Sequence, residues 1–435
     1  MNLNTAVKKI LLFCFCFVFL ASAFGQENSN VFLSLTSTNN RFDIALLPFK
    51  NSGANGTDGK ILQLINKTIE NDLVLSRYFN VIKTSFVSNY GLQAQMDFWK
   101  ASGASALVDG EGKITGANIS ISIQLYDIKS KELIWKQTFS GKASSYRILS
   151  HKISNEIVRR FTGEDGIALS KIAFINDGTK FKELYTADYD GHNLRRLTRD
   201  NKLNVLPKWA PSGAQIIYTS YLFNNPDLFS LNLSANKRSV VSKYQGLNTA
   251  AAYSPDGQRI VLTLSRGSYP NLYMIDARGQ IVRKMTDGYF IDTSPSFAPN
   301  GQEIVFISDR MGYPQLYIMN VSGGNVRRLP ANGYCDSPAW SPRGDKIVFT
   351  MRIGNSNYDI YIYDLRTSNI TKLTQGNGNN EDPVWSPDGR FVAFSSTRGG
   401  KREIYIMSID GLSIRKLAEI AGNSYTPSWS VNIEN

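Results

Sequence analysis

A five-residue turn recurs along the second half of the chain, and it constrains the fold more than any other feature of the sequence. Each copy has an aromatic residue, then Ser or Ala, Pro, a variable residue and Gly. The copies begin at Trp209, Tyr253, Phe297, Trp340 and Trp385, and a shortened copy begins at Trp429. Successive aromatic residues are 43 to 45 positions apart. A repeat of this length with aromatic and Gly markers is typical of β-propeller blades.

Each repeat also has the residue pattern of several short strands. An apolar run follows the turn, as at residues 304–306, and an alternating run comes next, as at residues 316–319. A turn that contains Gly or Asn then leads to another short strand, such as residues 326–329. Four short strands per period, joined by turns, predict one antiparallel blade.

The two ends of the repeat array are complementary. The array opens at residues 171–174 with no aromatic-Pro strand before it, and it closes at residues 425–429 with no strands after it. We expect the C-terminal strand to supply the innermost strand of the first blade. This pairing would close a six-bladed propeller over residues 170–435 and remove the open sheet edges.

The first 23 residues are typical of an export signal. Lys8 and Lys9 precede the apolar run at residues 10–20, and Ala21, Ser22 and Ala23 form an A-x-A cleavage site. The apolar run is shorter than the roughly 20 residues that a membrane-spanning helix needs. We therefore expect residues 1–23 to be removed and the mature protein to be exported and soluble.

Residues 41–163 follow a different pattern from the repeats. Residues 43–49 predict a strand, and residues 61–73 have apolar side chains at helical spacing. Residues 119–125 alternate between apolar and polar, which predicts a half-buried strand, and residues 145–161 predict a second helix that stops at Gly163. We expect a small α/β domain over residues 41–163, preceded by a mature N-terminal segment over residues 24–40.

The composition argues against a catalytic or metal centre. The chain has two His, His151 and His192, and only Cys335 remains once the signal is removed, so clustered zinc ligands are missing. No G-x-S-x-G nucleophile motif occurs. The formal net charge of +12 is scattered rather than gathered in a basic stripe, so nucleic acid is not expected as a partner. We expect no catalytic residues, no metal and no cofactor.

Polar side chains precede the innermost strand of each repeat. Because six inner strands converge on one axis, we expect these side chains to crowd around a single opening, the propeller mouth. The expected set is Asn204, Asn248, Asp292, Asp336, Glu381, Asp382 and Tyr425. One interpretation is a docking site for a protein. The alternative is an enzyme or small-ligand receptor in which Asp336, Glu381 and Asp382 hold a cation or a sugar.

The order of these parts resembles the TolB family of periplasmic Tol–Pal components. Supporting stretches are I-A-L-L-P-F at residues 44–49, S-H-K-I at residues 150–153 and F-T-G-E-D-G at residues 161–166. The resemblance covers nearly the whole mature chain. It implies a non-enzymatic, monomeric adaptor in the periplasm, peripheral to the envelope rather than membrane-spanning. Such an adaptor supports outer-membrane integrity and invagination during cell division.

The resemblance also implies two partners and two contact regions. In this family the lipoprotein Pal binds at the propeller mouth, and the matching positions here are Leu247, Asn248, Ala250, Asp292, Thr293 and Ser294. Leu247 stands where relatives such as the enterobacterial protein have His. In the family the N-terminal segment contacts TolA and signals to the propeller mouth. The resemblance assigns the TolA contact here to Glu27, Val31, Phe32, Leu33 and Leu35.

Overall fold

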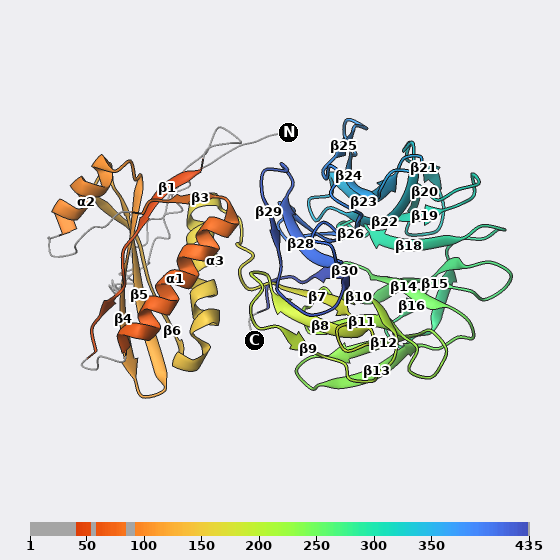
Figure 1. Cartoon of the computed structure of the whole chain (residues 1–435), viewed down its shortest axis with the longest axis horizontal. Helices are drawn as coiled ribbons and strands as arrows, with labels where there is room; N and C mark the ends of the chain where they lie inside the picture. Colours follow the sequence, from red (N-terminus) through yellow and green to blue (C-terminus); the bar gives the residue numbers. More distant parts are fainter. Residues whose placement is uncertain (1–40, 54–57, 84–91, 434–435) are drawn as a thin grey trace, which may run out of the picture.

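Two structural units follow one another along the chain, each with its own sheets and hydrophobic core. The computed structural model describes residues 41–53, 58–83 and 92–433. Within these ranges the chain forms an α/β domain and then six four-stranded sheets (Figure 1). The expected fold class, a small α/β domain followed by a six-bladed propeller, is confirmed. No helix in these ranges is long and apolar enough to cross a membrane.

The α/β domain is built on one mixed sheet with the strand order β3-β1-β4-β5-β6, and β2 pairs with β4. Its strands are β1 (Phe42–Leu46), β2 (Lys50–Asn51), β3 (Phe79–Val81), β4 (Ala106–Thr115), β5 (Asn118–Asp127) and β6 (Glu132–Lys142). Its helices are α1 (Asp58–Ser76), α2 (Leu92–Ala101) and α3 (Tyr146–Thr162), with a 3-10 turn, η1 (Ala143–Ser145), before α3.

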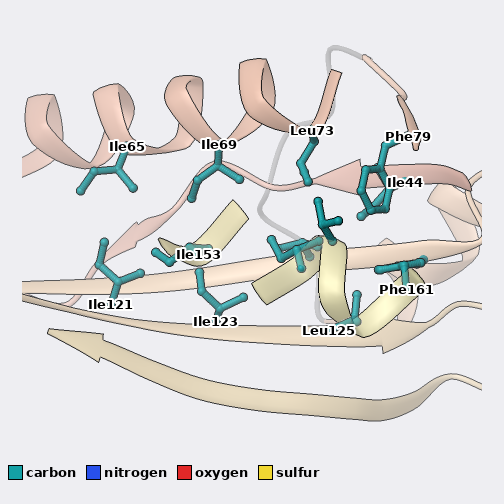
Figure 2. Close-up of a cluster of buried hydrophobic side chains, with 14 of the residues drawn as sticks. Ile44, Ile65, Ile69, Leu73, Phe79, Ile121, Ile123, Leu125, Ile153 and Phe161 are labelled. Atoms are coloured by element: carbon teal, nitrogen blue, oxygen red, sulfur yellow. The ribbon is translucent and has the colours of Figure 1, made fainter. Parts of the chain in front are cut away.

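Helices α1 and α3 cover one face of this sheet because both carry an apolar stripe. Ile65, Ile69 and Leu73 of α1 point toward the sheet, and Ile121 and Ile123 of β5 face them (Figure 2). From α3, Ile153 and Phe161 enter the same core. Gly163 ends α3 in the left-handed conformation, with φ 73° and its N–H bonded to the carbonyl of Arg159. Both helices lie between the sheet and the propeller (Figure 1).

The six sheets of the second unit are antiparallel blades. Two of them consist of β10 (Asn204–Trp209), β11 (Gln215–Ser220), β12 (Asp227–Asn232) and β13 (Lys237–Ser242), and of β14 (Asn248–Tyr253), β15 (Arg259–Leu264), β16 (Asn271–Asp276) and β17 (Ile281–Lys284). The next two consist of β18 (Asp292–Phe297), β19 (Glu303–Ser308), β20 (Gln315–Asn320) and β21 (Arg327–Arg328), and of β22 (Tyr334–Trp340), β23 (Lys346–Arg352), β24 (Asp359–Asp364) and β25 (Ile370–Lys372). The fifth consists of β26 (Asn380–Trp385), β27 (Phe391–Ser396), β28 (Glu403–Ser408) and β29 (Ile414–Lys416).

The sixth blade joins the two ends of the repeat array. It has the order β30-β7-β8-β9, with β7 (Lys171–Asn176), β8 (Glu183–Asp188), β9 (Arg195–Arg196) and β30 (Ser424–Trp429). Strand β30 pairs antiparallel with β7, so that Ser424 lies opposite Asn176 and Trp429 lies opposite Ile172. The prediction that the C-terminal strand closes the ring is confirmed.

Every innermost strand contains a β-bulge at its third repeat position. The pairing register shifts there in all six blades, for example between Thr249 and Ala252. The residues at that position have positive φ, between 46° and 56°, although none is Gly: Leu206, Ala250, Ser294, Ser337, Asp382 and Thr426. A non-Gly residue in this region is strained, and bulges are typical of places where a strand turns a side chain toward a site.

The repeated turns lie on the face of the ring that meets the α/β domain. Arg343, within the turn that follows Trp340, pairs with Glu164 at 2.7 Å. Arg390, just after the turn that follows Trp385, donates to the carbonyl of Ser76 at 2.8 Å and lies 3.5 Å from the ring centre of Tyr78. The α/β domain therefore covers this face, and the opposite face of the ring is left free of it.

Candidate functional site

The free face of the ring, which we call the mouth face, is formed by the starts of the innermost strands. In each blade the first strand runs away from this face and pairs antiparallel with the second, so the loops that lead into the third strand return to it. The loops between consecutive blades lie there too. All six blades therefore present two loops each around one axis.

A narrow axial channel runs through the ring at the level of the bulges. Its walls are the six bulge residues, Leu206, Ala250, Ser294, Ser337, Asp382 and Thr426, together with the residue that follows each of them and Lys208. In five blades the following residue is Pro, and in the blade that begins with β14 it is Ala251. The cavity measures about 40 Å³, and a water needs at least roughly 10–15 Å³ on this measure. The channel thus has room for a few waters but not for a sugar ring.

The structure does not bring three residues of the expected mouth set to this channel. Asn204, Asn248 and Asp292 occupy the first strand position and are completely buried. The side-chain amide of Asn248 donates to the carbonyls of Pro226, Tyr244 and Gly246 at 3.2, 2.6 and 3.0 Å. Asp292 accepts a 3.1 Å bond from Arg310. These buried side chains hold the mouth loops in place. The expectation that they crowd around the opening is therefore wrong.

Three of the remaining predicted residues line the channel, and the other five are at least partly exposed. Thr293, Glu381 and Tyr425 occupy the second strand position and are partly exposed, as is Leu247 just before β14. Asp336, also at the second position, is exposed. Ala250, Ser294 and Asp382 occupy the bulge position and line the channel. The sequence reading therefore combined residues from three successive strand positions.

Three carboxylates on two adjacent blades make one side of the mouth acidic. Asp336 is exposed, but protein surrounds much of its carboxyl group. This partial desolvation raises the pKa of Asp336 to about 6, and the nearby carboxylates of Asp382 and Glu381 act in the same direction. Glu381 forms an ion pair with Arg402. Asp382 accepts hydrogen bonds of 3.2 Å from the hydroxyls of Ser337 and Ser395.

A single lysine lies within the channel walls. Lys208 forms no ion pair with any residue in the described part of the chain, and desolvation lowers its pKa, while the carboxylate of Asp382 acts in the opposite direction. The channel wall therefore contains one desolvated ammonium group and one carboxylate, that of Asp382. On the neighbouring side of the mouth, the hydroxyl of Tyr425 donates to Asp177 at 2.9 Å, and the ammonium of Lys182 lies 4.2 Å from its ring centre.

Exposed large apolar side chains on the loops of the mouth face were missed by the sequence reading. Six large apolar side chains are each at least 45% exposed on loops of four consecutive blades: Phe223, Tyr289, Ile291, Met311, Tyr313 and Ile353. We call this set the apolar rim. Tyr289 is the most exposed of them, at 81%. The available signal was the presence of apolar residues in loops that otherwise hold Gly, Ser, Asn and Asp. Exposed patches of this kind mark interaction surfaces.

The cluster that comes nearest to a metal-binding set lies at the junction of the two domains, away from the mouth. Asp72, His151 and Asp190 bring their ligand atoms within 4.8 Å of one another. However, Arg147 pairs with Asp190, and Asp72 already accepts bonds of 2.7 Å from both His151 and the Tyr189 hydroxyl. A guanidinium occupies the place of the cation, so this cluster is a structural joint. His151 is part of this joint.

Two further sequence expectations concern other parts of the chain. Cys335 is fully buried in β22, and burial raises the pKa of its thiol to about 12, so the thiolate form is disfavoured at neutral pH. The export signal and the N-terminal contact residues Glu27, Val31, Phe32, Leu33 and Leu35 lie outside the described residues.

The fold and the open mouth face define a two-domain β-propeller protein. Residues 158–431 match the model of the TolB β-propeller domain, and residues 35–134 match the model of the TolB amino-terminal domain. The chain belongs to the TolB family.

Individual relatives agree with this assignment. A protein of Desulfosudis oleivorans named Tol-Pal system protein TolB is 33% identical over 178 residues, which are 39% of this chain and 41% of that protein. A protein of the same name from Legionella pneumophila (strain Corby) is 31% identical over 189 residues, 42% of this chain and 45% of that protein. The chain thus spans less than half the length of these relatives. The crystal structure of TolB from Acinetobacter baumannii has a TM-score of 0.78 and 28% identity, covering 90% of this chain and 96% of that one.

Proposed function

We propose that this protein is a non-enzymatic adaptor of the Tol–Pal system in the periplasm, where it supports outer-membrane integrity and invagination during cell division. Pal binds at the mouth face, and TolA binds the N-terminal segment that contains Val31, Phe32 and Leu33. Membership in the TolB family and the names of the relatives support a role in the Tol–Pal system. The observation that carries the Pal contact is the pairing of an acidic mouth with an apolar rim on the face that the α/β domain leaves free.

The mouth face has the physical composition of a protein-binding surface. Burying one large apolar side chain contributes about 1.5–3 kcal/mol, and the apolar rim offers six of them on adjacent loops. Asp336, Glu381 and Asp382 add a charged region that selects the partner's orientation. Thr293, Ser294 and Leu247 complete the contact surface, while Asn248 and Asp292 act indirectly by holding the loops in place.

The alternative function, an enzyme or receptor for a sugar or cation at the acidic mouth, receives less support from the geometry. The channel of about 40 Å³ does not admit a sugar ring. The carboxylates of Glu381 and Asp382 already have partners in Arg402, Ser337 and Ser395. Metal analysis of the purified protein tests directly whether a cation is bound.

Calorimetric titration of the mature protein with Pal tests the proposal. The double variant Glu381→Gln, Asp382→Asn removes two mouth charges, and Asn tolerates the positive φ of 56° at position 382. We expect at least tenfold weaker binding of Pal by this variant and unchanged binding of TolA. The matched control Asp256→Asn changes an exposed carboxylate in a repeated turn on the other face. Absence of binding to both Pal and TolA by the unaltered protein would contradict the proposed function.

A further inference from the structure

A second cavity lies between the two domains, on the side opposite the mouth. It measures about 240 Å³ and is bounded by the end of α1, by the link at Ile167 and by strands β27, β28, β29 and β30. Crevices between domains are common places for ligand binding. The mouth and the proposed Pal contact make no use of this cavity.

The charged groups in the cavity wall are all cationic. Arg41, Arg77 and Arg415 line it, and none of its other wall residues is acidic. Arg77 is compensated, since it pairs with Asp410 at 3.1 Å just outside the wall and donates to Ser408 at 2.6 Å. Arg41 is exposed at the edge. The wall therefore carries more positive charge than its surroundings neutralise.

Arg415 is the cation with the least compensation. It donates to the backbone carbonyl of Tyr189 at 2.6 Å and forms no ion pair with a carboxylate in the described ranges. The charge of Asp190 acts on Arg415, but the ion pair of Asp190 is with Arg147. Desolvation lowers the pKa of Arg415. A partly buried guanidinium that lacks a carboxylate is costly, and an anion in the adjacent cavity would remove that cost.

Most of the remaining wall is apolar, and Ser408 and Ser413 also border the cavity. Ile167, Phe391, Ile406 and Trp429 are each less than 10% exposed and border the cavity. The indole N–H of Trp429 already donates to the hydroxyl of Ser170 at 2.8 Å, so the indole has no free donor to offer a ligand. The apolar side chains of this wall favour a hydrocarbon group beside the guanidinium groups.

We propose that this interdomain cavity binds an amphipathic carboxylate, a ligand with one anionic group and a short apolar body. The carboxylate pairs with the guanidinium groups of Arg415 and Arg41, since a guanidinium matches carboxylate geometry through two parallel N–H bonds. The apolar body packs against Phe391, Ile406 and Trp429. This assignment is independent of the proposed function at the mouth.

Calorimetric titration of the mature protein with octanoate tests the assignment, with acetate and octanol as reference ligands. We expect saturable binding of octanoate and at least tenfold weaker binding of both references, because each lacks one half of the ligand. Arg415→Gln should weaken octanoate binding at least tenfold, which corresponds to about 1.4 kcal/mol. Arg41→Gln alters an exposed residue, so it should weaken binding without affecting folding.

The matched control is Arg283→Gln. Arg283 occupies the same position of the outermost strand in another blade, and it likewise donates to a backbone carbonyl, that of Ser322 at 2.7 Å, but it does not border the cavity. This variant should bind octanoate as the unaltered protein does. Equal binding of octanoate by the Arg415→Gln variant, or equal affinity for octanol, would overturn the proposal. A tenfold gain on removal of residues 24–40 would also overturn it, since the chain's own N-terminal segment would then be the occupant.

Discussion

The hydroxyl of Tyr189 donates a 2.7 Å hydrogen bond to Oδ1 of Asp72, and this bond joins the propeller to helix α1. The other carboxylate oxygen of Asp72 lies 2.7 Å from Nδ1 of His151 on α3. One buried carboxylate thus connects helices α1 and α3 to the ring. Asp72 and Asp190 are the two acidic groups of this cluster.

Asp72→Ala should destabilise the whole protein rather than one domain. It leaves the Tyr189 hydroxyl and the His151 ring nitrogen buried without a partner and removes one of two negative charges, which together cost about 3–5 kcal/mol. Tyr189→Phe is the milder comparison, because Asp72 keeps its bond to His151, and it should cost about 1 kcal/mol. Urea denaturation followed by tryptophan fluorescence measures both. A decrease of less than about 1 kcal/mol in the free energy of unfolding for Asp72→Ala would contradict the role of this cluster in joining the two domains.

The raised pKa of Asp336, about 6, predicts a pH-dependent stability. Its folded pKa lies above the value of 3.8 for a free carboxyl, so folding favours the protonated form. The stability associated with this group is therefore complete below pH 3.8 and is lost as the pH rises through 6. Asp336→Asn should raise the melting temperature at pH 7.5 and leave it unchanged at pH 3.5.

Asp256→Asn serves as the comparison for this pH dependence. Hydrogen bonds from the Ser254 hydroxyl and the backbone of Gln258 lower the pKa of Asp256, so its contribution is present above pH 3.8 and is lost on acidification. The variant should lower the melting temperature at pH 7.5, opposite to Asp336→Asn. Thermal denaturation at the two pH values measures both. Equal shifts for Asp336→Asn at pH 3.5 and pH 7.5 would show that its carboxyl is not the cause.

The ring was predictable because its signal repeats, whereas the mouth depended on a register that the sequence hides. From Asn204, Asn248 and Asp292, the sequence analysis expected a polar residue at the first position of each innermost strand, facing the mouth. In the fourth repeat the buried first position is held by Cys335, so Asp336 was matched one position too far along. The bulge residues Leu206 and Asp382 have positive φ values, but neither is a glycine, so the sequence did not indicate this conformation. The Pro after most bulges was the clue, since a residue before Pro avoids the right-handed helical region.

The apolar rim should contribute to Pal binding in proportion to exposure. Tyr289 is 81% exposed on the loop between β17 and β18, so Tyr289→Ser should weaken Pal binding about tenfold without changing stability. Leu412→Ser is the control, because Leu412 is 74% exposed on the opposite side of the ring, at the turn between β28 and β29. Calorimetry with Pal measures both affinities. Equal effects of the two variants would remove the rim from the proposed contact.

A deletion in the N-terminal segment should distinguish the binding of TolA from the binding of Pal. Deleting residues 24–35 removes the proposed TolA contact, including Val31, Phe32 and Leu35, and leaves the mouth face intact. We expect TolA binding to be lost, and Pal affinity to change because the family resemblance implies signalling from this segment to the mouth. Pull-down with TolA and calorimetry with Pal provide the readouts. Retention of TolA binding together with an unchanged Pal affinity would contradict the assignment of this segment.

The contact between the blade closed by β30 and the blade that precedes it should be sensitive to an added methyl group. Gly191 has φ 89°, and a Cβ there would lie 1.9 Å from the carbonyl oxygen of Leu417 in the neighbouring blade. Gly116 also has a positive φ, 61°, but a Cβ there would meet nothing within 4 Å. Gly116→Ala should therefore lower the free energy of unfolding only by the backbone strain, about 1 kcal/mol. Gly191→Ala adds a clash with rigid backbone and should cost at least about 2 kcal/mol more. Urea denaturation compares the two, and equal decreases in the free energy of unfolding would mean that the contact between these two blades adjusts to the added methyl group.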